Sequence, residues 1–561
     1  MKEMSTVDLR ARWIAVKGDR TTIEQAWERL ERYVLPYRGM FFKDEKSEHT
    51  IEWRKPHIYD DTAVMACQTL ASSINGALTS FSDMWFEFRF REDELNGDFE
   101  TKKWLDHATK VCYFALRESD FPLEINEAYL DLVGFGTAML FEEEVTDEAG
   151  NFTGLDFTSI PIKHCFFETD AKGRVLYFYR RREMTPVQIV DDFPARHVPA
   201  DIAEQSMTSQ GAIQKYTVIT AIYPRENYRS ADVSKKLPPT RRPWGRVSFL
   251  EKDGKQLSKR GGFYEMPGFA PRWRKTNDSI WGHSPGMVCM ANITTLNDLV
   301  ELTMQHLGKV VDPPSFVTER GLLSNLDLDP SGLSVVRSKD DFWQMESTAR
   351  FDVGELRIEK LQEQIRKAYF IDQLELKESP AMSATETNAR MELMQRLLGP
   401  TEGRIRSDLL DPCLMRTFNI MYRAGRIDPY PQIVVERQGN LDIDYTGPLA
   451  KGQRASTANA IERAVGMIQG LGELVPEVKD MPDWIEMLDI YFDIIGVPKK
   501  AMKDKKKLLA AQAKAENTGQ DEDDLGTAMA EGQVMEQAGK GAKAMQEAGL
   551  DPANMLGAGN A

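Results

Sequence analysis

The sequence predicts a mainly helical α+β fold, and two patterns of apolar residues carry this prediction. Over most of the first 135 residues, and again over 284–307 and 352–372, apolar residues recur at spacings of three and four, as on one face of an amphipathic helix. Between about 137 and 275 the pattern changes to short apolar runs separated by turn residues, which is typical of β-strands. The chain has 561 residues, enough for roughly three or four domains.

Residues 5–35 are predicted to form one or two helices, because their apolar residues follow helical spacing and Pro36 ends the pattern. Two more helices are predicted over 100–117 and 123–133. The apolar face of the first stretch consists of Trp13, Ile14, Ile23, Trp27, Leu30 and Val34.

A helix built largely of Ala, Ser and Thr is predicted after residue 60, with Asp60 or Asp61 as its N-cap. Small side chains let such a helix approach a neighbour closely, and that neighbour is either in the same chain or in another copy of it. Trp85 and Phe86 follow as an extended anchor. The apolar stripe of this helix is Ala63, Cys67, Leu70, Ile74 and Leu78.

The region from 137 to 275 is predicted to be rich in strands. One pair of strands flanks the turn DAKG at 170–173, and the dipeptide DG at 253–254 joins another pair. A short helix interrupts the strands, with Thr185 as its cap and Pro186 at its first position.

A long helix is predicted over 284–307, where Ser284 is the N-cap and Pro285 occupies the first helical position. At a rise of 1.5 Å per residue it spans roughly 36 Å. Its wide apolar stripe consists of Met287, Met290, Ile293, Leu296, Leu299, Val300, Met304 and Leu307.

A second long helix, spanning roughly 32 Å, begins with a capping box formed by Asp352 and Glu355. Glu363 and Lys367 lie four residues apart and support it. The two long helices therefore bracket a compact β segment at 310–350. The side chains predicted to line the second helix are Leu356, Leu361, Ile365, Ala368 and Tyr369.

The sequence LELKESPAMS, residues 374–383, breaks the second helix, and a further capping box begins at Ser383. Residues after 500 lack aromatic side chains and are rich in Gly, Ala, Met and Gln, so disorder or weak helix is expected there. The segments predicted in between are helices to about 424 with interruptions at Gly399-Pro400 and Pro412, strands at 433–436 and 441–445, and helices over 448–496.

The composition of the chain argues against several classes of protein. The formal charge of −16 (71 Lys and Arg, 87 Asp and Glu) argues against a protein that grips nucleic acid over its whole surface. The five cysteines include no CxxC pair, which argues against a disulfide framework or a zinc site and fits a reducing compartment. The N-terminus lacks the apolar core of a signal peptide, and no apolar run approaches membrane-spanning length. A soluble intracellular product is expected.

One motif suggests catalysis. GHSPG at 282–286 matches the nucleophile elbow G-x-S-x-G, which would make Ser284 the nucleophile of a serine hydrolase. That motif uses the backbone N–H of the residue after the serine in its oxyanion hole, and Pro285 has no N–H. A helix N-cap at Ser284 followed by Pro285 at the first helical position explains this motif better.

Other candidate sites are weaker still. His164 and Cys165 are adjacent but lack companions at metal-ligand spacing, and a strand is the better interpretation. The acidic stretch 325–332 is predicted to be a turn, and no GxxxxGK[ST] motif indicates an ATP-driven motor. The basic stretches 180–182 and 235–246 could contact phosphate, but a strand and a solvated hairpin loop are the better interpretations. No catalytic residue, cofactor or metal is expected.

The remaining motifs are W-x-x-L-x-x-Y-V-L-P-Y at 27–37, YDDTA…LASSINGALTS…WF at 59–86, MT-P-x-Q at 184–188, GGFYEMPGFAPRW at 261–273, WGHSPGM…LN at 281–297, VVDPP at 310–314, SATETNARMELMQRLLGP at 383–400 and PLAKGQ from 448. In this order along the chain, they resemble the motifs of the portal proteins (head-to-tail connectors) of short-tailed bacteriophages. The resemblance covers about residues 20–500 and excludes the tail.

The resemblance implies a portal-type fold, in which a wing, a stem of two helices, a clip and a helical crown build a ring of about twelve subunits. The implied parts are the wing at 1–275 and 384–447, stem helix 1 at 276–309, the clip at 310–350, stem helix 2 at 351–372, the tunnel loop at 373–383, the crown at 448–500, and a flexible low-complexity tail at 501–561.

The resemblance also implies which residues meet the DNA channel. The stem would include Ser284, Pro285, Glu301, Glu355, Glu363 and Lys367. The tunnel loop would contain Leu374, Glu375, Leu376, Lys377, Glu378, Ser379, Pro380, Ala381 and Met382.

The implied function is structural. The ring would sit at one capsid vertex of the virion, after assembly in the host cytoplasm, as the channel for DNA packaging and ejection. Its partners would be other copies of itself, double-stranded DNA, the terminase motor, tail adaptor proteins, and capsid and scaffold proteins, without a membrane. An acidic lumen is expected, because a wall rich in Lys or Arg would hold the phosphates. A non-channel internal virion or scaffold protein is the alternative, ahead of the serine hydrolase.

Overall fold

The computed structural model divides the chain into two compact units, Met1–Gln453 and Arg454–Ala561. In the second unit, residues 460–468 are helical, as predicted there. The residues that the structure describes are 3–38, 58–81, 84–147, 151–208, 213–225, 237–276, 279–311, 315–317, 342–344, 351–374, 399–437, 439–446, 460–468, 484, 487–488 and 491.

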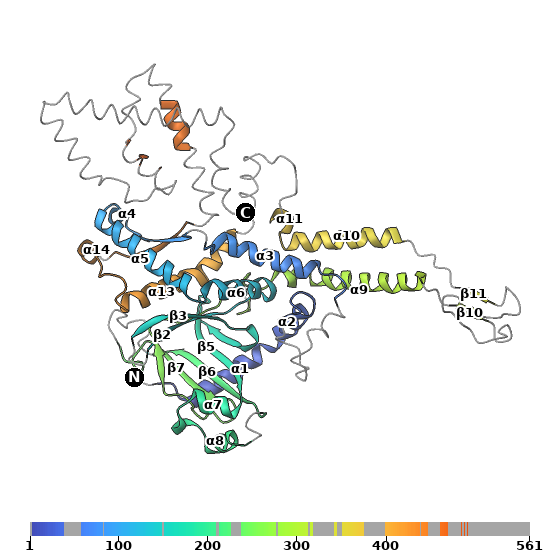
Figure 1. Ribbon diagram of the computed structural model, residues 1–561, viewed down its shortest axis with the longest axis horizontal. Helices are drawn as coiled ribbons and strands as arrows, with labels where there is room; N and C mark the ends of the chain where they lie inside the picture. The colour runs from blue at the N-terminus through green and yellow to red at the C-terminus, as the bar shows by residue number, and fades with distance from the viewer. Residues whose placement is uncertain are drawn as a thin grey trace. The chain divides into compact units, whose positions relative to one another are not determined.

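Helices and an antiparallel sheet region together form the first unit, so the predicted α+β class is confirmed (Figure 1). The described helices of this unit include α1 (Thr6–Asp19), α2 (Thr21–Tyr33), α3 (Thr62–Leu78), α4 (Asp93–Asn96), α5 (Phe99–Glu118), α6 (Phe121–Phe135), α7 (Pro186–Asp192), α8 (Ala200–Ser206), α9 (Pro285–Val311), α10 (Phe351–Ala368), α11 (Ile371–Leu374), α13 (Asp411–Arg423) and α14 (Gln432–Arg437).

The strands in the described part of the chain form four antiparallel groups, in the orders β4-β5-β6-β7-β8, β3-β2-β9, β1-β12 and β10-β11. The predicted strand region therefore contains the two larger sheets, with α7 and α8 inserted between β5 and β6. The strands are β1 (Phe86–Phe90), β2 (Leu140–Thr146), β3 (Phe152–Ser159), β4 (Cys165–Thr169), β5 (Val175–Met184), β6 (Tyr216–Pro224), β7 (Trp244–Leu250), β8 (Gly261–Phe263), β9 (Gly268–Phe269), β10 (Ser315–Val317), β11 (Phe342–Gln344) and β12 (Leu441–Tyr445).

Helix α1 packs on one face of the five-stranded sheet through two fully buried side chains, Leu9 and Trp13. The Trp13 ring meets the Phe166 ring edge-on at 4.3 Å between centroids. Ile14, which the sequence placed on this face, is exposed instead. A residue one position after Trp13 is rotated by about 100° around the helix, which turns it away from the sheet.

Strand β1 pairs with β12, which joins residues more than 350 positions apart in the chain. Trp85, immediately before β1, is buried, and its ring lies against the rings of Phe86 and Tyr445. The predicted extended anchor is therefore confirmed. It fixes the segment after α3 to the C-terminal part of the same unit.

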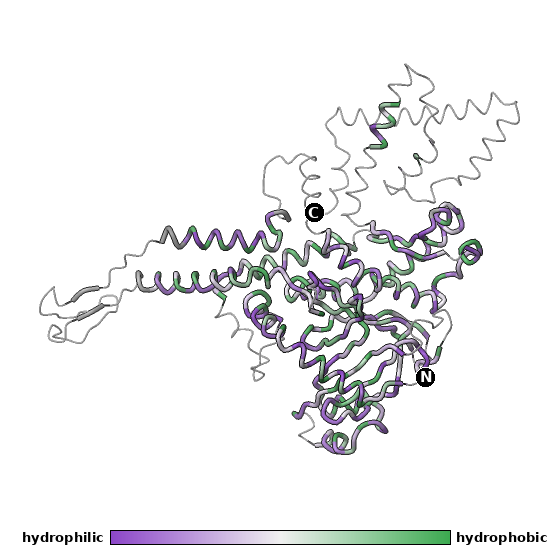
Figure 2. The backbone as a smooth tube through the Cα atoms, turned by 180° about the vertical axis from the view of Figure 1, so that it is seen from behind, coloured by the Kyte–Doolittle hydropathy of each residue, from purple (hydrophilic) through white to green (hydrophobic). Residues whose placement is uncertain are grey.

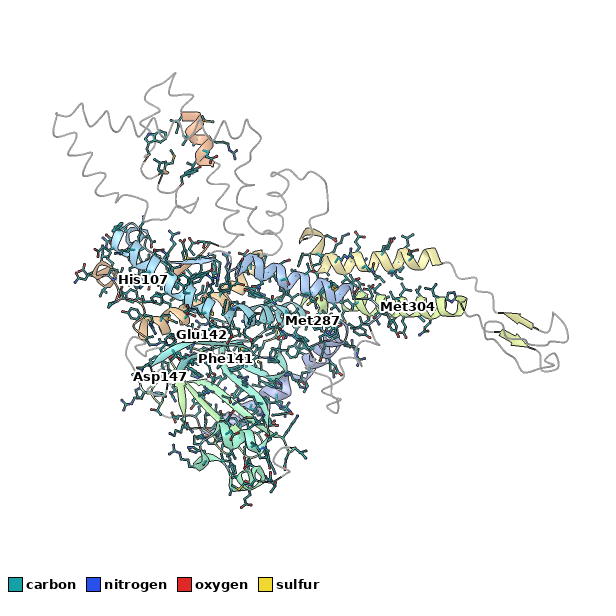
Figure 3. The ribbon with its side chains drawn as sticks, in the orientation of Figure 1. His107, Phe141, Glu142, Asp147, Met287 and Met304 are labelled. Carbon is teal, nitrogen blue, oxygen red and sulfur yellow. The ribbon has the colours of Figure 1, made fainter. Side chains whose placement is uncertain are left out.

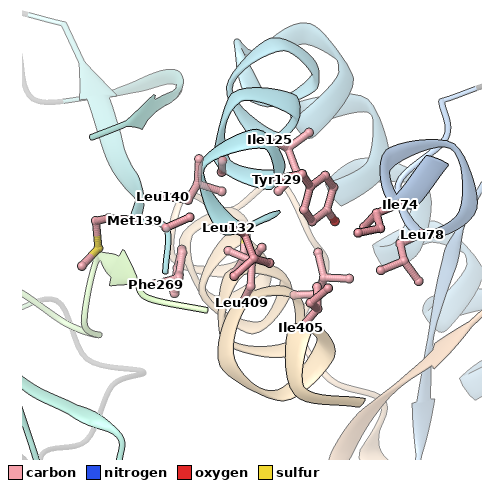
Figure 4. Packing of buried hydrophobic residues seen from close by; sticks show 14 of the residues in the cluster. Ile74, Leu78, Ile125, Tyr129, Leu132, Met139, Leu140, Phe269, Ile405 and Leu409 are labelled. Atoms are coloured by element: carbon pink, nitrogen blue, oxygen red, sulfur yellow. The ribbon is translucent and has the colours of Figure 1, made fainter. Parts of the chain in front are cut away.

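The main core lies among the helices and contains the predicted stripe of α3 (Figure 4). Ile74 and Leu78 face the buried Tyr129 of α6, and Ile405 and Leu409 complete the cluster from the C-terminal part. Helix α3 packs on α6 and α10 of its own chain, so its small residues serve a close approach within the subunit.

Two predictions for the C-terminal part are wrong. Residues 433–436 belong to helix α14 and not to a strand, because the Pro431 carbonyl accepts the N–H groups of Val434 and Val435 and starts a helical turn. The helix does not break at Pro412 either. The preceding turn widens to a π turn at Arg406–Leu410, which lets the helix continue past the missing proline N–H.

A buried polar cluster joins β2 to α13 (Figure 3 labels Glu142). The Glu142 carboxylate accepts a hydrogen bond from the Thr417 hydroxyl at 3.0 Å and lies 3.4 Å from Nε of Arg416. Arg416 also donates to the backbone oxygen of Glu265 at 3.0 Å. Burial raises the pKa of Glu142 to about 8, against the opposing effects of Arg416 and Thr417.

This cluster predicts how stability depends on pH. The folded-state pKa of Glu142 lies above its unfolded value of 4.5, so its contribution to stability is complete below pH 4.5 and is lost as pH rises to about 8. The Glu142→Gln variant cannot titrate there. We expect its free energy of unfolding to fall less between pH 5 and pH 8 than that of the wild type, by roughly 2–4 kcal/mol.

Urea denaturation of both proteins at the two pH values measures this difference. Titrating groups elsewhere, such as the buried Asp131, contribute equally to both proteins and cancel. Equal pH dependence of the two proteins would contradict the prediction.

Candidate functional site, a pair of antiparallel helices

Helices α9 and α10 lie side by side and form what we call the helix pair (Figures 1 and 2). With 27 and 18 residues they are about 40 Å and 27 Å long. The chain leaves the body along α9 and returns along α10. Between them β10 pairs with β11, with Ser315 opposite Gln344, and the rest of the predicted β segment lies outside the described residues.

The base of α9 confirms the predicted cap. Ser284 is fully buried, and its hydroxyl oxygen accepts the backbone N–H of Met287 at 3.1 Å. Pro285 is the first helical residue. The serine hydroxyl therefore serves as a helix cap inside the core, where a hydrolase substrate could not reach it.

Gly286 sets how closely α9 approaches its neighbours. A Cβ atom at this position would lie 2.7 Å from both Leu30 Cδ2 of α2 and the Tyr369 hydroxyl oxygen, which is too close for either contact. The tyrosine side chain is fully buried at the end of α10. The missing side chain at residue 286 thus lets α2, α9 and the end of α10 meet at one point.

The half of the helix pair near this point is anchored in the main core. Ile293 and Leu296 of α9 and Leu361 and Ile365 of α10 are all buried. Burying each such side chain contributes roughly 1.5–3 kcal/mol. This part of both predicted stripes is confirmed.

The segment before α3 holds both helices by hydrogen bonds. The Tyr59 backbone N–H donates to Oδ1 of the buried Asn297 on α9 at 2.8 Å. The Asp60 carboxylate accepts Nε2 of Gln362 on α10 at 2.7 Å and the Thr62 backbone N–H at 3.0 Å. We call residues 59–60 the bracket.

The bracket also has a tyrosine hydroxyl near a predicted stem residue. Desolvation raises the pKa of Tyr59, and the Glu301 carboxylate, which shares a hydrogen bond with the hydroxyl, raises it further. The sequence indicated Asp60 or Asp61 only as a helix cap. Asp60 contacts Gln362, about 300 positions later in the chain, and such a contact leaves no local pattern in the sequence. The bracket therefore could not be predicted.

Beyond the bracket, apolar side chains of the helix pair are exposed. Met287 near the base is packed against the core, whereas Met304 and Leu307 of the same predicted stripe are exposed (Figure 3). Leu356 of α10 is 55% exposed, so its prediction as a lining residue is wrong. It lies five residues before Leu361, which rotates it by about 140° from the buried face.

The charges of the helix pair nearly balance. Helix α9 contains two acidic residues and one basic residue, and α10 contains four of each, so the pair has a formal charge of −1. Glu363 and Lys367 form the predicted ion pair at 2.6 Å, and both are exposed. Glu301 accepts from Gln305, and Glu355 is exposed. The strong negative charge of the chain thus lies mainly outside the helix pair.

The bounds of α10 differ from the prediction. The helix was expected to run from 352 to 372, but it begins at Phe351 and ends at Ala368, before the short α11. Phe370 between them has φ 60°, the left-handed region that a non-glycine residue adopts only under constraint. Of the predicted tunnel loop, Leu374 ends α11. The others lie outside the described residues: Glu375, Leu376, Lys377, Glu378, Ser379, Pro380, Ala381 and Met382.

Comparison with known proteins identifies the family to which the sequence motifs pointed. The family described as "Bacteriophage head to tail connecting protein" matches residues 6–502. The chain belongs to this family.

Two curated relatives carry more specific names. A "Probable portal protein" of Bordetella phage BPP-1 is 27% identical over 505 residues, which cover 87% of each chain. The "Portal protein" of Salmonella phage epsilon15 is 24% identical over 567 aligned positions, covering 97% of this chain and 96% of the relative. The similarity therefore extends over most of the length of both relatives.

The thiols and one histidine of the chain are shielded from solvent. All five cysteines are free and buried, and burial raises the pKa of the Cys289 thiol to about 12. Burial lowers the pKa of His164 to about 4. In the part of the chain that the structure describes, no group of three or more His, Cys, Asp or Glu residues could hold a metal ion.

Arginines of the two predicted basic stretches form ion pairs and hydrogen bonds within the chain. Arg181 pairs with Glu183 at 2.8 Å, and Arg242 donates to the Gly262 carbonyl at 3.2 Å. Among the described residues, no helix has the length and apolar character to cross a bilayer.

The bracket predicts an energetic coupling between Asp60 and Gln362. In a double-mutant cycle of Asp60→Ala and Gln362→Ala, we expect a coupling free energy of roughly 1 kcal/mol, because a charged, half-buried hydrogen bond joins the two side chains. The cycle cancels the separate effect of the Asp60 carboxylate on the Thr62 N–H. Chemical denaturation measures the free energy of unfolding of each protein in the cycle.

Glu363→Ala with Lys367→Ala is the matched control, an exposed ion pair on the same helix. Its expected coupling is below about 0.5 kcal/mol. A bracket coupling no larger than that of the control would show that the bracket does not hold α10.

Proposed function

We propose that the chain is a portal protein, a structural ring at one vertex of a phage capsid. The family membership and the names of both relatives support this, and so does the helix pair, whose far half has exposed apolar side chains that a single copy does not cover. A ring of about twelve copies would place one helix pair beside the next.

In this proposal the parts of the chain have separate tasks. The wing would be residues 1–275 and 384–447, the stem 276–309 and 351–372, the clip 310–350 and the tunnel loop 373–383. The helix pair makes up most of this stem. Residues 448–500 would form the crown. The stem supports this division most directly, because the described side chains of its two helices that are buried in the main core lie toward one end of the pair.

The ring would be the channel for DNA packaging and ejection. A channel must let phosphates pass without holding them, since each phosphate neutralised by Lys or Arg releases counterions and adds affinity. On α10 the Lys367 ammonium is already paired with Glu363, and the helix carries equal numbers of acidic and basic residues. Such a wall offers DNA weak and exchangeable contacts.

The partners follow from the position at the vertex. The clip would bind the terminase motor during packaging and tail adaptor proteins afterwards, and the wing would meet capsid and scaffold proteins. Moderate interfaces suit partners that replace one another. The protein would assemble in the host cytoplasm and remain in the virion, and its role there is not enzymatic.

Electron microscopy of the purified chain tests this proposal. We expect annular particles with a central hole, because the exposed apolar surface of the helix pair favours closed assembly. A protein that stays monomeric at micromolar concentration and near-physiological salt would contradict the proposal. Filled or irregular particles would favour an internal virion or scaffold protein instead.

The Ser284→Ala variant separates a structural role from hydrolysis. We expect the free energy of unfolding to fall by about 1 kcal/mol, because the cap on Met287 is lost, while annular particles still form. Thr185→Ala, which removes the cap of the short helix α7, is the matched control. An esterase activity that disappears with Ser284→Ala but persists in the control would contradict the proposal that Ser284 serves only as a helix cap.

A further inference from the structure

The outer faces of the two helices in the pair differ in chemistry. The outer face of a helix is taken here as the side opposite its buried residues. Between residues 285 and 308, helix α9 contains no Lys or Arg. Helix α10 has a charged residue at every second or third position (Figure 2 shows it largely in the hydrophilic colour).

The outer face of α9 is mostly apolar or small. Its residues follow one another at spacings of three and four, so they form one stripe of about 21 Å along the helix. Val288 is 71% exposed and Leu302 is 61% exposed. The exposed stripe consists of Val288, Ala291, Thr295, Asp298 and Leu302.

The outer face of α10 is charged. Glu359, Lys360, Glu363 and Lys367 are all exposed there. Leu356 also lies on this face, and it is nearly as exposed as Leu302 of α9. Removing these four charges from water would cost free energy that only well-placed partners could offset.

We propose that the outer face of α9 is the surface through which one copy of this chain contacts the next, and that the outer face of α10 stays in water. This inference rests on the proposed ring. Each copy must bury surface against two neighbours, and the α9 stripe loses only one carboxylate, that of Asp298, from water on burial. The α10 face would lose four charges.

A ring also constrains what the stripe meets. Closure by rotation uses head-to-tail contacts, in which one surface meets a different surface of the next copy. The α9 stripe therefore faces some other part of its neighbour. That part must supply a cation or hydrogen-bond donor to Asp298, because a buried unpaired carboxylate would weaken the contact.

Two leucines of similar exposure provide the test, Leu302 on α9 and Leu356 on α10. In the full-length chain, Leu302→Glu places a charge in the inferred contact, whereas Leu356→Glu adds one to a face already charged. Native mass spectrometry and negative-stain microscopy measure the fraction of chain in rings. We expect Leu302→Glu to reduce that fraction at least tenfold and Leu356→Glu to leave it within twofold of the wild type.

A further variant, Leu302→Lys, separates burial from charge repulsion by Asp298 and Glu301. Loss of rings with both Glu and Lys at residue 302, at unchanged thermal stability of the monomer, supports the inference. Rings that persist in either variant overturn it, as does equal loss with Leu356→Glu. Failure of the wild type to form rings would overturn the proposed function itself, so the two failures are distinguishable.

Discussion

The close approach of three helices at Gly286 is the constraint on which the rest of the arrangement depends. Leu30 of α2 and Tyr369 at the end of α10 both reach the position that a side chain at residue 286 would fill. Because α9 starts there, its first turns and the last turns of α10 are buried in the same core. The helix pair is therefore anchored in the core at this end, whereas Leu302 and Met304 toward its other end are exposed.

The body that holds the helix pair is built from two parts of the chain that are far apart in sequence. Strand β1 pairs with β12, and Arg416 of α13 reaches the buried Glu142 of β2. These contacts join segments that precede α9 in the chain to segments that follow α10. Movement at the far end of the helix pair thus needs no rearrangement of the body.

The sequence predicted those features that depend on local spacing. The caps at Ser284 and Thr185 and the buried Leu361 and Ile365 were all predictable, since each depends on residues within a few positions. The errors at Ile14, Leu356 and 433–436 have a common cause. Apolar residues were assigned to a buried face or strand by type, although their position around the helix decides the exposure.

Features that depend on distant contacts could not be predicted from the sequence. The bracket joins residue 60 to residue 362, and the left-handed Phe370 is imposed by the packing of α10 and α11 rather than by its own preference. The balanced charge of the helix pair could have been counted from the sequence. It was hidden by the net charge of the whole chain, which says nothing about where the acidic residues lie.

Hydrogen–deuterium exchange of the isolated chain and of the assembled particle tests most directly the claim that the helix pair is anchored at one end and completed by another copy at the other. We expect amides near Ile293 and Ile365 to exchange slowly in both states. Amides near Leu302 should exchange quickly in the isolated chain and slowly after assembly. Uniformly slow exchange along α9 in the isolated chain, or exchange near Leu302 that assembly leaves unchanged, would contradict the account.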